Sequence, residues 1–96
     1  MKKQLIVYVD MEGASGIFEN NCDAVVHGTS VWQEYGRKCI TSDVLAVCKA
    51  ANECKIDEIM IYDGHYAGNP EYNIIIEELP NNIKLFNTWN RCFDWR

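Results

Sequence analysis

Two short apolar runs stand out along the chain. Residues 5–9 (Leu-Ile-Val-Tyr-Val) and 59–62 (Ile-Met-Ile-Tyr) are continuously apolar and rich in β-branched side chains. Such runs are typical of strands that are covered on both faces, because neither face then alternates with polar residues. Residues 83–86 form a weaker third run. We therefore predict three strands.

Between the first two runs, apolar residues recur every three or four positions, which is typical of a helix. Ser30, followed three residues later by Gln33, fits a capping box at the helix start. The pattern predicts helical structure over residues 30–54, with a break near residues 40–42, so either one or two helices are possible. The predicted buried face consists of Val44, Val47, Cys48, Ala51 and Cys54.

A second helix is predicted after the second strand, over residues 69–79. Asn69 suits the N-cap and Pro70 the first helical position. The residues at helical spacing that would form its buried face are Tyr72, Ile75, Ile76 and Leu79.

Strands that alternate with helices are joined by crossovers and therefore run parallel. We predict a single α/β domain over residues 1–96, in which helices cover a parallel β-sheet in a three-layer α/β/α arrangement. Three strands are few for a sheet that needs both faces covered and its edges protected. We therefore expect this fold to be incomplete, and more chain or another subunit to complete it.

Four polar residues follow the first two strands. Asp10 and Glu12 come after the first, and Asp63 and His65 after the second. In open α/β sheets, sites form outside the carboxyl ends of the strands, so these side chains should converge. Three carboxylates and an imidazole would shift one another's pKa values unless a cation neutralises them. Oxygen and nitrogen donors without thiolates favour a catalytic zinc or manganese site over calcium.

Gly13 and Gly16 flank the acidic pair, and they permit tight turns and close approach to a ligand. Ordinary structural roles remain open for each residue taken alone. Asp10 or Asp63 could begin a turn, and Glu12 could be a solvated loop acid. The joint placement favours a metal site, whereas His27 has no such neighbours and is interpreted as a loop residue.

Composition narrows the function classes. The net charge of -5 argues against nucleic acid or an anionic membrane as a partner, because both need a basic surface. The first apolar run is too short for a signal peptide or a bilayer span, so we expect a cytoplasmic protein. The five cysteines lack metal or redox spacing and are expected to be reduced.

Three segments together resemble the DppA-like D-aminopeptidases. They are Val9-Asp10-Met11-Glu12-Gly13-Ala14-Ser15-Gly16, then Tyr35-Gly36-Arg37 with Thr41, and then Asp63-Gly64-His65. The resemblance covers most of residues 4–86. It implies a two-zinc peptidase that removes N-terminal D-amino acids from short peptides and assembles into a homo-oligomeric ring.

By this resemblance, Asp10 would bridge both zinc ions, Glu12 would bind one ion and His65 the other. Asp63 is not a ligand in the family pattern, and we expect it to support His65. The remaining family ligands and the catalytic histidine lie beyond residue 96. We therefore expect no catalytic residue within these 96 residues, weak or single-ion zinc binding, and no appreciable peptidase activity.

Two alternatives remain. The chain could be a non-catalytic remnant, that is, a structural or oligomerising α/β domain. It could also be a magnesium-dependent phosphatase of the haloacid-dehalogenase type, although that class has Asp where this chain has Glu12. The tail, with Trp89, Phe93 and Trp95, departs from the family pattern, and we expect it to dock on the domain or to meet more protein.

Overall fold

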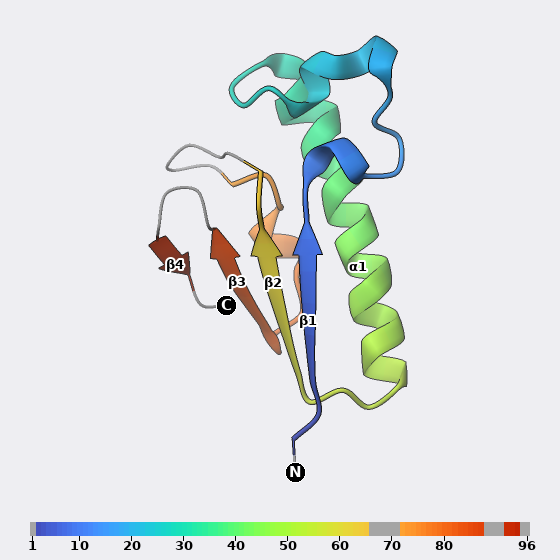
Figure 1. Cartoon of the computed structure of the whole chain (residues 1–96), viewed down its shortest axis with the longest axis vertical. Helices are drawn as coiled ribbons and strands as arrows, with labels where there is room; N and C mark the ends of the chain where they lie inside the picture. The colour runs from blue at the N-terminus through green and yellow to red at the C-terminus, as the bar shows by residue number, and fades with distance from the viewer. Residues whose placement is uncertain (1, 66–71, 88–91, 95–96) are drawn as a thin grey trace.

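The computed structural model describes residues 2–65, 72–87 and 92–94 of the chain. Within them, four strands form one sheet in the order β1-β2-β3-β4 (Figure 1). The first three strands run parallel, and β4 pairs antiparallel with β3. The three predicted strands and the α/β class are confirmed. The strands are β1 (Gln4–Val9), β2 (Glu58–Asp63), β3 (Ile83–Asn87) and β4 (Cys92–Asp94).

The long helical region is continuous from residue 30 to residue 53. Its first part includes a π-helix, η3 (Trp32–Gly36), which leads directly into α1 (Arg37–Glu53). The predicted break near residues 40–42 is therefore wrong, because the irregularity lies one to two turns earlier. The cap is also shifted by one residue. The hydroxyl of Thr29, not that of Ser30, accepts a hydrogen bond from the Trp32 backbone N–H at 3.1 Å.

The buried stripe of α1 is narrower than the sequence pattern indicates. Val44, Cys48 and Ala51 are buried, as predicted, whereas Val47 and Cys54 are exposed. The four cysteines whose side chains the structure describes are free thiols (Cys22, Cys39, Cys48 and Cys54).

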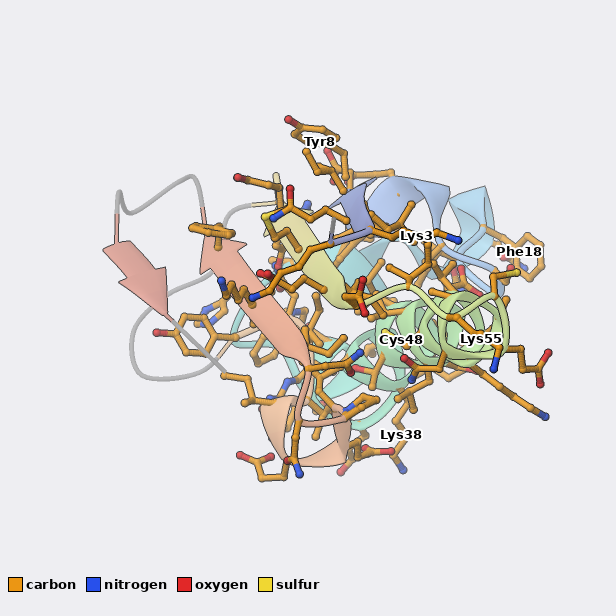
Figure 2. All side chains as sticks on the ribbon, turned by 90° about the horizontal axis from the view of Figure 1, so that it is seen from below. Lys3, Tyr8, Phe18, Lys38, Cys48 and Lys55 are labelled. Carbon is orange, nitrogen blue, oxygen red and sulfur yellow. The ribbon has the colours of Figure 1, made fainter. Side chains whose placement is uncertain are left out.

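One face of the sheet packs against α1 and contains the core. Ile59, Ile61 and Ile83 are fully buried on this face and belong to one apolar cluster with residues of the helix. Side chains on the opposite face point away from α1, as Tyr8 does in Figure 2. Ile6 is 51% and Tyr8 76% exposed, so no helix of the described residues covers this face. The described chain thus provides one of the two helical layers of the predicted arrangement.

Aromatic rings line this open face across the three parallel strands. Tyr8 of β1 stacks on Tyr62 of β2 with ring centroids 5.1 Å apart, and Tyr62 stacks on Phe86 of β3 at 4.5 Å. These residues are direct cross-strand partners in the sheet register. Such pairs stabilise the strand register even without a covering layer.

The helix predicted over residues 69–79 is wrong for the part that the structure describes. Residues 72–75 are not helical, and only one 3-10 turn, η4 (Ile76–Glu78), follows. Ile74 is fully buried, whereas Ile75 is not. The Ile75 backbone N–H donates instead to the hydroxyl of Thr41 on α1, at 2.9 Å. This tertiary hydrogen bond replaces the one that a helix would have supplied.

Some expectations fall on segments outside this description. The proposed cap at Asn69 and Pro70 and the aromatic residues Trp89 and Trp95 lie outside the described residues. Only Cys92–Asp94 of the tail are placed, as β4. No helix in the described part of the chain is long and apolar enough to cross a membrane.

Gly36 allows the π-helix to contact the loop that follows β1. This loop contains two 3-10 segments, η1 (Met11–Gly13) and η2 (Glu19–Val25). A Cβ on Gly36 would lie 1.9 Å from the carbonyl oxygen of Ala24 in η2, which is backbone and has little freedom to shift. Only glycine therefore permits this contact, which holds the loop near the end of the sheet.

We predict that Gly36→Ala lowers the free energy of unfolding by about 2 kcal/mol, because the new methyl group overlaps the Ala24 carbonyl. For a domain of this size, the melting temperature should fall by roughly 10 °C. Gly13→Ala is the matched control, since a Cβ there meets nothing within 4 Å. Thermal unfolding followed by circular dichroism measures both variants, and equal melting temperatures would contradict the prediction.

Candidate metal centre

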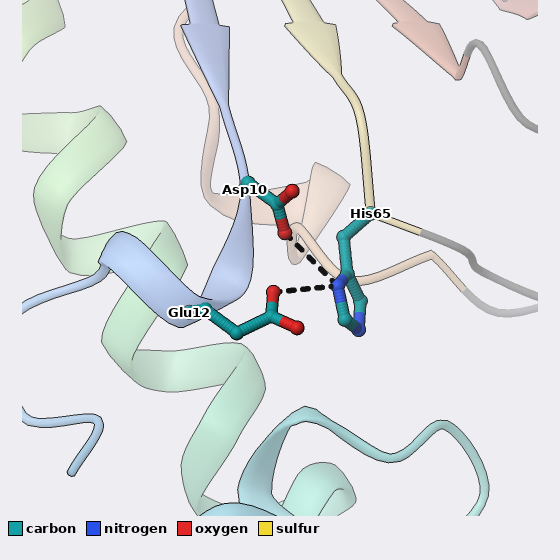
Figure 3. Close-up of side chains that lie close together, drawn as sticks. All are labelled: Asp10, Glu12 and His65. Atoms are coloured by element: carbon teal, nitrogen blue, oxygen red, sulfur yellow. Dashed lines mark hydrogen bonds and ion pairs between the residues drawn. The ribbon is translucent and has the colours of Figure 1, made fainter. Parts of the chain in front are cut away.

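The pairing of β1 with β2 brings the predicted ligands together. The two strands are parallel and in register, with Val9 opposite Asp63, so Asp10 and His65 leave the sheet at the same edge. A hydrogen bond from the Gly64 N–H to the Val9 carbonyl, at 2.9 Å, holds the strand ends together beyond this pair. Asp10, Glu12 and His65 each direct one possible ligand atom into a cluster (Figure 3), and these atoms all lie within 4.8 Å of one another.

His65 is the centre of the cluster. Its Nδ1 lies 3.0 Å from Asp10 Oδ1 and 3.1 Å from Glu12 Oε1. Its Nε2 lies 2.5 Å from the carbonyl oxygen of Val25, at the end of η2. A carbonyl can only accept, so Nε2 must carry a hydrogen and donate it. In the neutral imidazole, Nδ1 is then the atom with the free lone pair.

This arrangement requires positive charge between the three side chains. A lone pair on Nδ1 that faces two carboxylate oxygens at about hydrogen-bond distance would be repelled by both of them. The pKa of His65 reflects the same balance. Burial lowers this pKa. The Val25 carbonyl and the two carboxylates together raise the pKa by a larger amount, so the net shift is upward. Either a proton or a metal ion at Nδ1 satisfies the cluster.

Asp10 and Glu12 stay accessible while His65 is largely buried. The side chains of the two acids are 60% and 64% exposed, against 14% for His65. A hydrogen bond with Glu12 lowers the pKa of Asp10, and contacts with His65 lower it further, against a smaller opposing effect of burial. Both acids therefore have room to adjust around a cation while the imidazole is held in place.

Asp63 is not one of the three clustered residues, but it holds the backbone of His65. It is 2% exposed, and its Oδ1 accepts a hydrogen bond from the His65 backbone N–H at 2.9 Å. Its Oδ2 accepts a second hydrogen bond, from the amide of Asn73, at 3.1 Å. Burial raises the pKa of Asp63, whereas these hydrogen bonds and the charge of His65 oppose the shift. Of the four residues predicted to converge, three therefore meet as possible ligands, and the fourth, Asp63, holds the loop of His65.

The two predicted glycines differ in importance. Gly16 has φ +92°, which favours glycine, and its carbonyl accepts hydrogen bonds from the hydroxyl of Tyr35 at 2.8 Å and the amide of Asn21 at 3.0 Å. Gly13 has no positive φ and no close neighbour, so its position does not require glycine. His27 lies in a turn, as expected, and its ring packs against that of Trp32.

Three residues that contribute to the site were not predicted. The Val25 carbonyl is a backbone group of a loop residue, so no side-chain pattern could have identified it. Asn73 is fully buried, and Trp32 donates its indole N–H to the Asn73 side-chain oxygen at 2.8 Å. The available signal was an asparagine beside the apolar run of residues 74–76, since a buried amide must be hydrogen-bonded.

Hollows adjoin both carboxylates of the cluster. One, of about 340 Å³, is lined by Tyr8, Val9, Asp10, Tyr62 and Gly64. The other, of about 210 Å³, is lined by Glu12, Ile17, Phe18, Cys22 and Val25. Each includes one of the two carboxylates, so both carboxylates are open to a ligand.

The separations from His65 Nδ1 to the two carboxylates fit a zinc ion after a small adjustment. Zinc binds carboxylate oxygen and imidazole nitrogen at about 2.0–2.2 Å in tetrahedral geometry, which separates neighbouring donor atoms by about 3.4 Å. The separations of 3.0 and 3.1 Å from His65 Nδ1 to the carboxylates are a few tenths of an ångström shorter. Small rotations of the exposed acids would supply the difference. Three protein donors also leave a fourth position free, as catalytic zinc sites require.

Comparisons with known proteins identify the family of the chain. Residues 3–93 match the model of the Peptidase M55 family, which is described as D-aminopeptidase. No curated protein and no solved structure matched the chain. The family match covers nearly all of the sequence, including both strands that carry the cluster. The chain therefore belongs to the M55 peptidases, the D-aminopeptidase family.

Proposed function

We propose that this chain contributes Asp10, Glu12 and His65 to the zinc centre of a metallo-aminopeptidase that removes N-terminal D-amino acids from short peptides. The observation that carries the proposal is the convergence of these three side chains at neighbouring strand ends, in a member of the D-aminopeptidase family. Neither part would suffice alone, since exposed acidic groups often occur without a metal.

The donor set favours zinc among the common divalent ions. Calcium and magnesium prefer oxygen ligands throughout, whereas the cluster includes an imidazole nitrogen that Val25 orients. Zinc also binds such sites more tightly than manganese does. A zinc ion supplies Lewis-acid chemistry, which activates water and polarises the scissile carbonyl.

Asp10 is suited to the bridging role that the family resemblance implies. Its Oδ1 faces His65, while its other carboxylate oxygen points away from the ring (Figure 3). A carboxylate in this position can contact two ions about 3.5–4 Å apart. The sequence contains only His27 and His65 as histidines, and His27 lies against Trp32 instead of in the cluster. We therefore expect the 96 residues alone to hold one ion and to show no appreciable turnover.

The hollows beside the cluster support a peptide substrate. On the Asp10 side, the rings of Tyr8 and Tyr62 offer an apolar surface. On the Glu12 side, Phe18 and Val25 belong to a smaller apolar lining. A peptide with its scissile carbonyl at the cation would place the residues on either side of that bond against these surfaces.

A structural or oligomerising role is the second candidate. It is favoured by the open apolar face of the sheet, where Ile6 and Tyr8 are exposed. In that case Asp10→Ala and His65→Ala would leave assembly unchanged, and the chain would bind no zinc. The family match favours the peptidase over the magnesium-dependent phosphatase. The homo-oligomer itself stays a prediction.

We predict that Glu12→Gln lowers the zinc affinity of the chain by roughly a hundred-fold or more. Loss of a partner that merely orients a ligand already costs about 10- to 100-fold, and loss of a ligand's charge should exceed this. Isothermal titration calorimetry with zinc measures the change. Glu53→Gln is the matched control, because Glu53 is an exposed acid at the end of α1. Equal affinities for both variants would contradict the assignment of Glu12 as a ligand.

We predict that zinc binds His65 through Nδ1 and leaves Nε2 protonated, because Nε2 donates to the Val25 carbonyl. Two-dimensional ¹H–¹⁵N spectra of the imidazole groups should show a zinc-dependent shift of the His65 Nδ1 resonance while Nε2 keeps its hydrogen. The ring of His27 serves as an internal control and should not respond. A shift confined to Nε2 of His65 would exclude the proposed geometry.

We predict that the 96-residue chain binds at most one zinc ion tightly and does not hydrolyse D-alanyl peptides above a zinc blank. Zinc content after equilibrium dialysis and release of D-alanine measure the two properties, with L-alanyl peptides as the stereochemical control. Two tightly held ions with D-selective turnover would show that the chain alone forms the complete site. Absence of zinc binding would refute the proposed function.

A further inference from the structure

We infer that Trp32 and Asn73 form a buried positioning pair that fixes His65 for metal binding, although neither residue lies in the cluster. This inference rests on the proposed function, since it concerns the same cation site. It assigns a role to the π-helix and to the segment after β2, both of which are distant in sequence from Asp10 and Glu12.

The side-chain amide of Asn73 can adopt only one orientation. The Trp32 indole N–H lies 2.8 Å from the Asn73 side-chain oxygen, and an indole nitrogen can only donate. The Asn73 amide NH₂ therefore points the other way, to the Asp63 Oδ2 at 3.1 Å and the His65 backbone carbonyl at 3.2 Å. Both of these oxygens are acceptors, so every contact of the amide is satisfied in this orientation alone.

Hydrogen bonds with other parts of the fold therefore fix every polar atom of His65 except one. Its backbone N–H donates to Asp63, its backbone carbonyl accepts from Asn73, and its Nε2 donates to Val25. The remaining polar atom is Nδ1, which faces the two carboxylates. The pair Trp32–Asn73 fixes this arrangement twice, through the His65 carbonyl directly and through Asp63 indirectly.

A role in stability alone does not explain why this network is polar. Asp63 and Asn73 are 2% and 0% exposed, and Trp32 is 1% exposed. Burying a carboxylate opposes folding unless hydrogen bonds compensate, and well-packed apolar residues often serve as well or better. Satisfied buried networks do, however, fix one geometry. The geometry fixed here is that of the loop carrying a proposed ligand.

Trp32→Phe tests the pair directly, because it keeps an aromatic ring in the core while it removes the indole N–H donor together with part of the ring volume. We expect zinc affinity to fall roughly tenfold, and the visible spectrum of the cobalt-substituted chain to change. Asn73→Leu removes all three amide contacts, and its zinc affinity should fall further, toward a hundred-fold. The readouts are calorimetric zinc binding, cobalt spectra and thermal unfolding of each variant.

Thr41→Val is the matched structural control. Thr41 is also buried and holds the same segment, through the Ile75 N–H, but it does not contact His65 or Asp63 through any hydrogen bond that the structure describes. This variant should unfold at a lower temperature while keeping its zinc affinity and cobalt spectrum. If Trp32→Phe and Asn73→Leu behave in the same way, the pair is structural and the inference is overturned.

Two further measurements separate this inference from the proposed function. If the wild-type chain binds no zinc, the proposed function fails, and the imidazole spectrum of His65 still reports on positioning. At a pH where His65 is neutral, the spectrum should show one tautomer in wild type and a mixture in Trp32→Phe, and identical spectra would overturn the inference. If the variants do not fold, the test is instead the rate of hydrogen exchange of the Trp32 indole N–H in the wild-type chain. Exchange should slow when zinc binds, and an unchanged rate would overturn the inference.

Discussion

The parallel pairing of β1 with β2 is the constraint on which the site depends. Because Val9 lies opposite Asp63, the residues that follow the two strands are brought together from positions more than fifty residues apart in sequence. A shift of one residue in the register would turn Asp10 away from the loop of His65. The apolar residues that set the register, such as Val7 and Ile61, therefore contribute to the chemistry without touching it. The stacked rings of Tyr8 and Tyr62 secure the same register from the open face.

The electrostatics of the cluster follow from the hydrogen bond that His65 donates to the Val25 carbonyl. Val25 determines which nitrogen of His65 carries the hydrogen, so the lone pair on the other nitrogen faces two carboxylates. Two acids and an imidazole in this position favour a cation, whether a proton or a metal. Exposure separates the roles, because His65 is held in the fold while Asp10 and Glu12 reach from the surface. A rigid imidazole with two adjustable acids can bind an ion without any movement of the backbone.

The sequence predicted the three parallel strands and the proposed ligands, but not β4, because the former depend on local patterns. Continuous apolar runs mark buried parallel strands, and polar residues directly after two such runs must meet when the strands pair. The segment before β3 was misinterpreted because its helical spacing competes with a tertiary hydrogen bond from Ile75 to Thr41. The cap at Thr29 and the π-helix depend on packing against the η2 loop, which Gly36 permits. Nor could a sequence pattern identify the Val25 carbonyl, since its role depends only on where the loop places its backbone.

The buried polar network is not explained by the packing of the described core alone. The core between the sheet and α1 is apolar and needs none of Asp63, Asn73 and Trp32 to be polar. Their hydrogen bonds converge on one residue, His65, and a fold that merely required stability would gain little from this convergence. The open face of the sheet is a separate feature, where Ile6 and Tyr8 are exposed apolar and aromatic side chains that no described helix covers. The polar network is explained if the described residues are built around the proposed metal centre.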